Sequence, residues 1–99
     1  WSDSDSITNF QEYLRIRSDQ PSPDYAAATA WIRTQCEALG LKIQETAFVE
    51  KKPVLTCTVA GSNANLPSFV FNSHMDVVPP GDPSKWDSPA FDAQISKDD

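Results

Sequence analysis

Two side chains able to support metal chemistry, His74 and Asp76, follow the most apolar run of the chain. In an extended segment, residues i and i+2 project to the same side, so both side chains can face one cavity. A neutral imidazole nitrogen is a good zinc ligand, and a nearby carboxylate can accept the hydrogen bond of the other ring N–H. The spacing therefore makes His74 a candidate metal ligand and Asp76 the carboxylate that orients it.

The same residues allow other interpretations. A single His-x-Asp pair after a strand is more often a structural hydrogen-bonded pair, and the chain has only this one histidine. A catalytic zinc typically takes three protein ligands, so the others would be carboxylates or come from elsewhere. A Ser73–His74–Asp76 triad is disfavoured because adjacent residues of a strand point to opposite faces, and because no Gly-x-Ser-x-Gly motif surrounds Ser73.

Two helices are expected before these residues. Apolar side chains recur at three- and four-residue spacing over residues 7–17, which predicts a helix there. The candidate N-caps of this helix are Ser4, Asp5 and Ser6. A loop with two prolines follows, because proline removes the backbone donor that a helix needs. Residues 25–39 have the same helical period, and Gly40 stands where a left-handed C-cap is common.

After the second helix the apolar period changes from 3.6 to 2, which is typical of strands. Residues 41–49 and 55–59 are predicted strands joined by a turn at residues 51–53. Residues 68–72 form an apolar run without alternation, as expected for a central strand covered on both faces. The predicted fold class is α/β: two N-terminal helices followed by strands of a mixed sheet. His74 and Asp76 would lie beyond a strand's carboxyl end, where sites in such sheets gather.

The remaining segments have weaker patterns. Trp86 and Phe91 are expected to anchor a proline-rich loop onto the body, and residues 95–99 could begin another strand. Cys36 and Cys57 are interpreted as two small buried hydrophobic residues, since free cysteine is commonly buried. A disulfide would require a secretory context, of which the sequence has no sign.

Charge and composition exclude some classes of function. The net charge of −6 repels phosphate backbones, so nucleic-acid binding is not expected. No apolar run approaches the roughly 20 residues that span a bilayer, so no membrane association is expected. The acidic N-terminal residues are unlike a secretory signal, and a cytoplasmic location is expected. Because the chain begins at Trp1 and not at methionine, we expect that it has been trimmed.

Three blocks of sequence carry a resemblance to a known family. Residues 71–79, Phe-Asn-Ser-His-Met-Asp-Val-Val-Pro, are similar to the first metal-binding signature of the aminoacylase and carboxypeptidase family of two-zinc metallopeptidases. Upstream, residues 13–18 followed by residues 20–25 resemble the aminoacylase branch, and downstream residues 86–91 do so as well. All three blocks occur in the family's order. Together they favour a metal-ligating role for His74 far more than its spacing does.

The resemblance implies a zinc-dependent hydrolase of N-acyl-L-amino acids, which releases a free amino acid and a carboxylate. In relatives the histidine matching His74 binds one of two Zn²⁺ ions, and the aspartate matching Asp76 supports it at the catalytic centre. A later glutamate acts as general base on a water activated by the metal, which attacks the amide carbonyl.

The resemblance also implies that much of the enzyme lies outside this chain. The other zinc ligands, the general base and a dimerising lid domain would follow Asp99. Residues 1–99 are thus expected to be an N-terminal fragment of the catalytic domain, inactive alone, whose partners are the rest of the chain and, as a homodimer, a second copy. The uncovered run at residues 69–71 would then make the isolated chain associate.

Two alternatives remain open at this point. The parent could be a related zinc carboxypeptidase or dipeptidase that acts on peptides. The chain could instead be a non-catalytic protein-binding domain, which should fold cooperatively on its own and bury its apolar strand.

Overall fold

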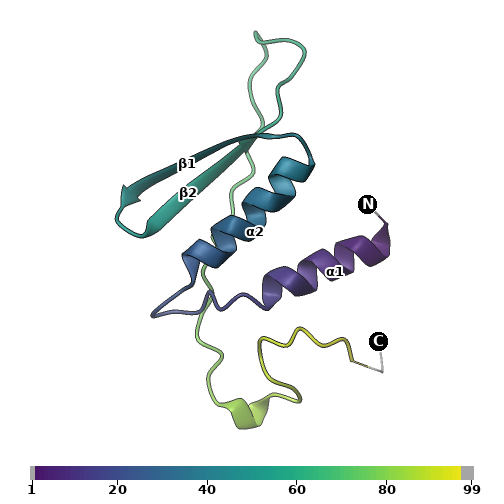
Figure 1. Ribbon diagram of the computed structural model, residues 1–99, viewed down its shortest axis with the longest axis vertical. Coiled ribbons are helices and arrows are strands. Elements are labelled where there is room, and N and C mark those ends of the chain that lie inside the picture. The colour runs from purple at the N-terminus through teal and green to yellow at the C-terminus, as the bar shows by residue number, and fades with distance from the viewer. Residues whose placement is uncertain (1, 97–99) are drawn as a thin grey trace.

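The computed structural model describes residues 2–96, and its chain runs from two helices into a β-hairpin and then a long irregular segment (Figure 1). The regular elements are α1 (Asp3–Leu14), α2 (Tyr25–Ala38), β1 (Lys42–Val49), β2 (Lys52–Thr58) and the short 3₁₀ helix η1 (Pro83–Lys85). This arrangement confirms the predicted α/β order of two helices followed by strands. Within the described residues, the two strands are antiparallel neighbours and form one sheet.

Helix α1 begins earlier than the sequence predicts because its N-cap is Ser2. The Ser2 hydroxyl accepts a 3.2 Å hydrogen bond from the backbone N–H of Asp5, and the Asp5 carboxylate accepts one of 2.9 Å from the Ser2 N–H. This reciprocal pair is a capping box, which satisfies two donors at the helix start. The candidates Ser4, Asp5 and Ser6 therefore lie inside the helix.

Helix α2 lies where its sequence pattern predicts. Asp24 caps its start by accepting a 2.9 Å hydrogen bond from the Ala27 N–H. At its end Gly40 has a φ of 68°, the left-handed conformation that glycine adopts without penalty. The N–H groups of Gly40 and Leu41 bond the carbonyls of Glu37 and Cys36, which is the Schellman pattern of helix termination.

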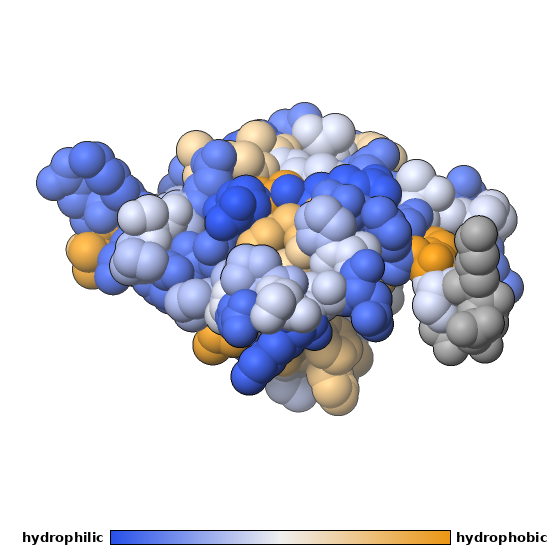
Figure 2. All heavy atoms as spheres, turned by 90° about the horizontal axis from the view of Figure 1, so that it is seen from below, coloured by the Kyte–Doolittle hydropathy of each residue, from blue (hydrophilic) through white to orange (hydrophobic). Residues whose placement is uncertain are grey.

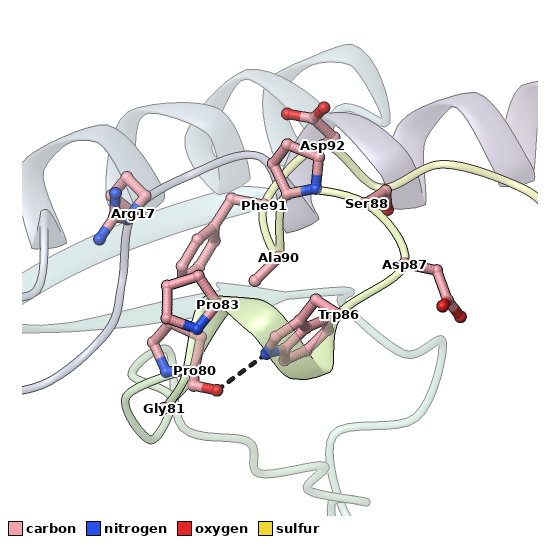
Figure 3. A pocket seen from close by; sticks show the side chains of 11 residues that line it. Arg17, Pro80, Gly81, Pro83, Trp86, Asp87, Ser88, Ala90, Phe91 and Asp92 are labelled. Carbon is pink, nitrogen blue, oxygen red and sulfur yellow. Dashed lines mark hydrogen bonds between the residues drawn. The ribbon is translucent and has the colours of Figure 1, made fainter.

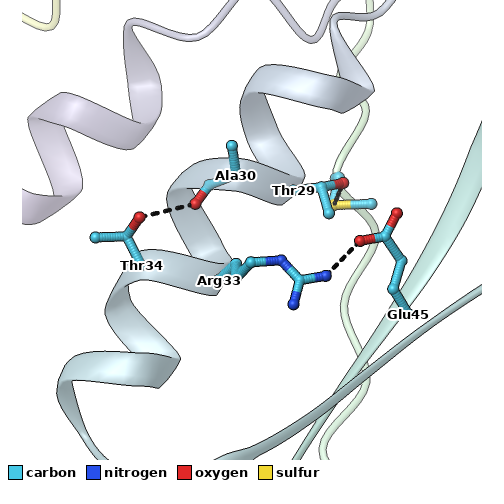
Figure 4. A network of polar contacts seen from close by, with 6 residues as sticks. Thr29, Ala30, Arg33, Thr34 and Glu45 are labelled. Carbon is cyan, nitrogen blue, oxygen red and sulfur yellow. Dashed lines mark hydrogen bonds and ion pairs between the residues drawn. The ribbon is translucent and has the colours of Figure 1, made fainter.

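The hairpin packs one face against α2 and forms the small core of the described chain. Ala28 is fully buried, and Cys36 and Thr29 are nearly so. An ion pair of 2.5 Å between Arg33 of α2 and Glu45 of β1 joins the two layers (Figure 4). The turn is tighter than predicted: Lys51 takes a positive φ of 61°, and β2 already begins at Lys52.

The predicted strand at residues 68–72 is wrong for this structure. The segment runs as irregular chain without a neighbouring strand, and a strand is stable only when its backbone groups pair. Phe69, Val70 and Phe71 are 92%, 81% and 92% exposed, and the two phenyl rings stack at 6.1 Å. The run is therefore uncovered in the described part of the chain.

Hydrophobic residues reach the surface at several separate places, which Figure 2 shows in orange among hydrophilic side chains. Besides residues 69–71, part of the apolar stripe of α1 is exposed, including Ile7 and Phe10. Among the described residues no helix combines the length and apolar character needed to cross a bilayer.

The C-terminal segment folds back along α1 (Figure 1). Gln11 and Arg15 donate side-chain hydrogen bonds of 2.7 and 3.1 Å to the carbonyls of Ala93 and Asp92. The predicted strand start at residues 95–99 is not observed at residues 95 and 96, and residues 97–99 lie outside the described part.

The aromatic side chains of Phe91 and Trp86 make different kinds of contact. The Arg17 guanidinium lies 4.4 Å from the ring centroid of Phe91, so Phe91 anchors the loop to the body as predicted. Trp86 instead donates a 2.9 Å hydrogen bond to the carbonyl of Pro80 and closes its own loop (Figure 3). This hydrogen bond lies within the loop, so the anchoring of Trp86 onto the body stays a prediction.

Candidate metal-ligand site

The segment that carries His74 and Asp76 is fastened to the chain that follows α1. Val77 forms an isolated parallel bridge with Asp19. Its N–H donates to the carbonyl of Ser18 and its carbonyl accepts from the N–H of Gln20, both at 2.9 Å. Asp19 is itself held by a two-point ion pair with Arg17, at 2.9 and 3.0 Å. These contacts fix the backbone one residue beyond Asp76.

The imidazole of His74 turns its Nδ1 atom toward Asp76. Nδ1 lies 2.6 Å from the backbone carbonyl oxygen of Asp76 and 3.3 Å from its carboxylate Oδ1. A carbonyl oxygen can only accept, so Nδ1 carries the proton and donates it. In the neutral ring the lone pair then lies on Nε2, and the His74 side chain is 82% exposed. This tautomer presents Nε2 outward as a potential ligand.

The carboxylate of Asp76 is held from its other side by Gln20. The Nε2 amide of Gln20 donates a 2.8 Å hydrogen bond to Oδ2. This bond, and to a smaller extent the proximity of His74, lowers the pKa of Asp76 from its ordinary value because both favour the charged form. Asp76 is therefore an ionised acceptor next to the His74 ring at neutral pH.

The alternation along this segment separates the two sides. Met75 points back toward α2, where its sulfur accepts a 3.9 Å contact from the Thr29 hydroxyl, whereas His74 and Asp76 share the other side. Ser73 donates its hydroxyl to the backbone carbonyl of His74 at 3.3 Å and not to the imidazole. The nucleophile–base hydrogen bond of a serine triad is thus not formed here.

The described chain brings few metal-ligating side chains together. Across residues 2–96, no three side chains among His, Cys, Asp and Glu are grouped so as to hold a metal ion. His74 nevertheless fits the role of one ligand, because its Nε2 is free, exposed and backed by a hydrogen bond at Nδ1.

A cavity lies beside this site and not at it. It has a volume of about 660 Å³ and lies between Arg17 and the loop that carries η1, with Trp86 and Phe91 among its lining residues (Figure 3). Neither His74 nor Asp76 lines it. Its connection to the candidate site is Arg17, which contacts Phe91 on one side and Asp19 on the other.

Sequence reasoning missed Gln20 as a component of the site. Gln20 lies 56 positions from Asp76, and a glutamine in a proline-containing loop carries no signal of such a contact. The backbone bridge through Val77 brings it there, and such pairing between an irregular loop and a distant segment has no periodic pattern to reveal it.

Comparison with known proteins finds aminoacylases. The chain is 46% identical to aminoacylase-1 of Sus scrofa and 45% identical to aminoacylase-1 of Homo sapiens, each over 74 residues. It is 31% identical to aminoacylase-1 of Dictyostelium discoideum over 77 residues. These matches cover 75–78% of this chain but 18–19% of the relatives, so the chain spans about a fifth of their length. No family model matches the chain.

These similarities confirm the resemblance to the aminoacylase branch that the three sequence blocks indicate. The class of proteins that the chain matches is the aminoacylases, and aminoacylase-1 is the particular protein that it resembles.

Proposed function

We propose that this chain is the N-terminal part of a zinc-dependent hydrolase of N-acyl-amino acids, in which His74 supplies one metal ligand through Nε2. The observation that carries the proposal is the orientation of the His74 ring, whose Nδ1 is engaged by Asp76 while Nε2 is free. The similarity to aminoacylase-1 supports the substrate class, because that name describes an enzyme that removes an acyl group from an amino acid.

In this proposal the chain's own residues position the ligand. The backbone carbonyl of Asp76 accepts a hydrogen bond from the Nδ1–H of His74, and the Asp76 carboxylate lies 3.3 Å from Nδ1. These contacts fix the tautomer and make Nε2 a better donor of its lone pair. Gln20 and the Val77 bridge hold Asp76 in turn. Zinc, when bound, would polarise the amide carbonyl and activate water. Because a catalytic zinc typically takes three protein ligands, the isolated chain is expected to be inactive.

The test is His74→Ala in the full-length enzyme. We expect turnover of an N-acetyl-amino acid to fall by more than about 100-fold and zinc content to drop, with an unchanged circular dichroism spectrum. Ser73→Ala is the matched control, since its hydroxyl bonds only a backbone carbonyl and its loss should leave turnover intact. Full activity and full zinc content in His74→Ala would refute the assignment.

A second comparison separates the proposed function from the peptidase alternative. The intact enzyme is expected to hydrolyse N-acetylmethionine faster than a dipeptide with the same C-terminal residue. Faster cleavage of the dipeptide would favour a carboxypeptidase or dipeptidase. We also propose a homodimeric, cytoplasmic parent, for which sedimentation of the intact enzyme and cell fractionation are the direct measurements.

A further inference from the structure

The two cysteines of the chain meet across the interface between helix and sheet. Cys36 lies in the last turns of α2 and Cys57 near the end of β2, 21 positions later, and their Sγ atoms are 2.6 Å apart. Both are free thiols in this structure. The sequence suggested two small buried hydrophobic residues, and such residues need only lie in the same core. In the structure the two sulfur atoms are in direct contact.

The elements on either side hold this pair in register. The carbonyl of Cys36 accepts the Leu41 N–H in the Schellman motif that ends α2, so the backbone on the helix side is fixed. On the sheet side, Cys57 stands opposite Ile43 in the antiparallel ladder. A disulfide requires the two sulfurs to reach bonding distance with little backbone movement, and the Sγ atoms already lie 2.6 Å apart.

We propose that Cys36 and Cys57 form a reversible disulfide by exchange with a low-molecular-weight disulfide, so that oxidation joins α2 covalently to β2. This bond would be transient and redox-dependent, unlike the permanent structural disulfide that requires a secretory context. The proposal rests on the contact between the two cysteines and not on the proposed hydrolase activity. It would fasten the small core, to which Cys36 belongs together with the fully buried Ala28.

The exchange proceeds in two steps that balance. The Cys57 thiolate, which is the more exposed of the two, attacks one sulfur of the small disulfide and releases one small thiolate. The Cys36 thiolate then attacks the Cys57 sulfur of the mixed disulfide and releases the second. The two cysteines lose two protons and two electrons in total, and the small disulfide is reduced to two thiols.

The environment of the pair favours this order of attack. Burial, followed by the contact with Cys57, raises the pKa of the Cys36 thiol to about 11. A thiol that is so rarely ionised is a poor first nucleophile. It can still complete the second step, because the structure holds it against the sulfur that it must attack.

The test is to treat the full-length, natively folded protein with oxidised glutathione, block free thiols, and map tryptic peptides without reduction. Lys42 and Lys51 lie between the cysteines, so cleavage separates them unless they are joined. We expect one linked peptide pair whose mass is about 2 Da below the sum of the two peptides. It should disappear after reduction with dithiothreitol, and its rate of formation should fall at least about tenfold in denaturant.

The variants Cys57→Ser and Cys36→Ser sharpen the test. Cys57→Ser should leave Cys36 largely unmodified because Cys36 is buried, whereas Cys36→Ser should stop at a glutathione adduct on Cys57. The proposal is overturned if wild-type protein retains two free thiols after oxidation, if it stops at a glutathione adduct, or if the linked peptides come from two different molecules. The peptide mapping of the oxidised wild-type protein tests the proposed disulfide even if a variant does not fold.

Discussion

The side-chain amide of Gln20 donates a 2.8 Å hydrogen bond to the carboxylate of Asp76, and this bond links the loop after α1 to the residue that orients His74. The adjacent residue, Val77, reinforces this link by pairing with the backbone of Ser18 and Gln20. A loop without regular structure thereby determines where the candidate ligand points.

Replacing Gln20 with Ala should weaken metal binding in the full-length enzyme. Without the amide donor the Asp76 carboxylate is free to turn away from His74, and groups that support a ligand typically change metal affinity by about 10- to 100-fold. We expect the lower end of that range, because Gln20 acts through Asp76. Competition with a chelator of known affinity measures the effect. Gln44→Ala, at an exposed position of β1, is the control and should leave affinity unchanged.

Acidification should loosen the first turn of α1. The backbone and side chain of Ser2 lower the pKa of Asp5, because they bond its charged form. A carboxyl whose folded-state pKa is depressed stabilises the fold above its unfolded pKa of about 4, and that contribution is lost as pH falls through the folded value. The protection factors of the amides of residues 5–7, which compare exchange with the intrinsic rate at the same pH, should therefore fall at low pH.

Asp5→Asn should remove most of this acid dependence. Asp3→Asn is the matched control, since it removes the same charge from the same turn but leaves the capping box in place. Equal effects of the two substitutions would show that general charge, and not the contact with Ser2, controls the helix start.

The isolated 99-residue chain should self-associate through residues 69–71. Phe69 and Phe71 are each 92% exposed, and contiguous exposed apolar surface favours association. Replacing both phenylalanines with serine should shift the chain toward monomer in sedimentation velocity at about 100 µM. Phe48→Ser, at a separate exposed site on β1, should shift it less. A wild-type chain that stays monomeric and melts sharply and reversibly would instead favour a self-sufficient binding domain.

Enlarging Ala28 should destabilise the packing of α2. Its side chain is fully buried, so Ala28→Leu must displace neighbouring atoms, at a free-energy cost of about 1–3 kcal/mol. Ala30→Leu places the same side chain on the exposed face of α2, where the change should stay within about 0.5 kcal/mol. Urea unfolding of the full-length protein gives both values. Similar costs at the two positions would contradict the placement of the helix.

Local chemistry made α2 and the hairpin predictable. Asp24 and Gly40 mark the ends of α2 through their own conformational preferences, and alternating side chains mark β1 and β2. The start of α1 was misplaced because several residues in the N-terminal stretch can cap a helix, and only the reciprocal bonds between Ser2 and Asp5 select one of them.

The candidate site was only partly predictable, for a related reason. The alternation of His74 and Asp76 is a property of extended chain, and the family resemblance identifies the pair. Residues 68–72 have the composition of a buried strand, but a strand forms only where a neighbour pairs with it, and no sequence pattern reports whether that neighbour is present.

The sequence by itself therefore determined α2, the hairpin, the His-x-Asp spacing and the similarity to aminoacylases, since these depend on residues close together along the chain or on their order. Only the tertiary structure decided that Gln20 holds Asp76 and that Cys36 touches Cys57. Those contacts join residues 56 and 21 positions apart, and they exist because elements pack in three dimensions at distances that no local preference encodes.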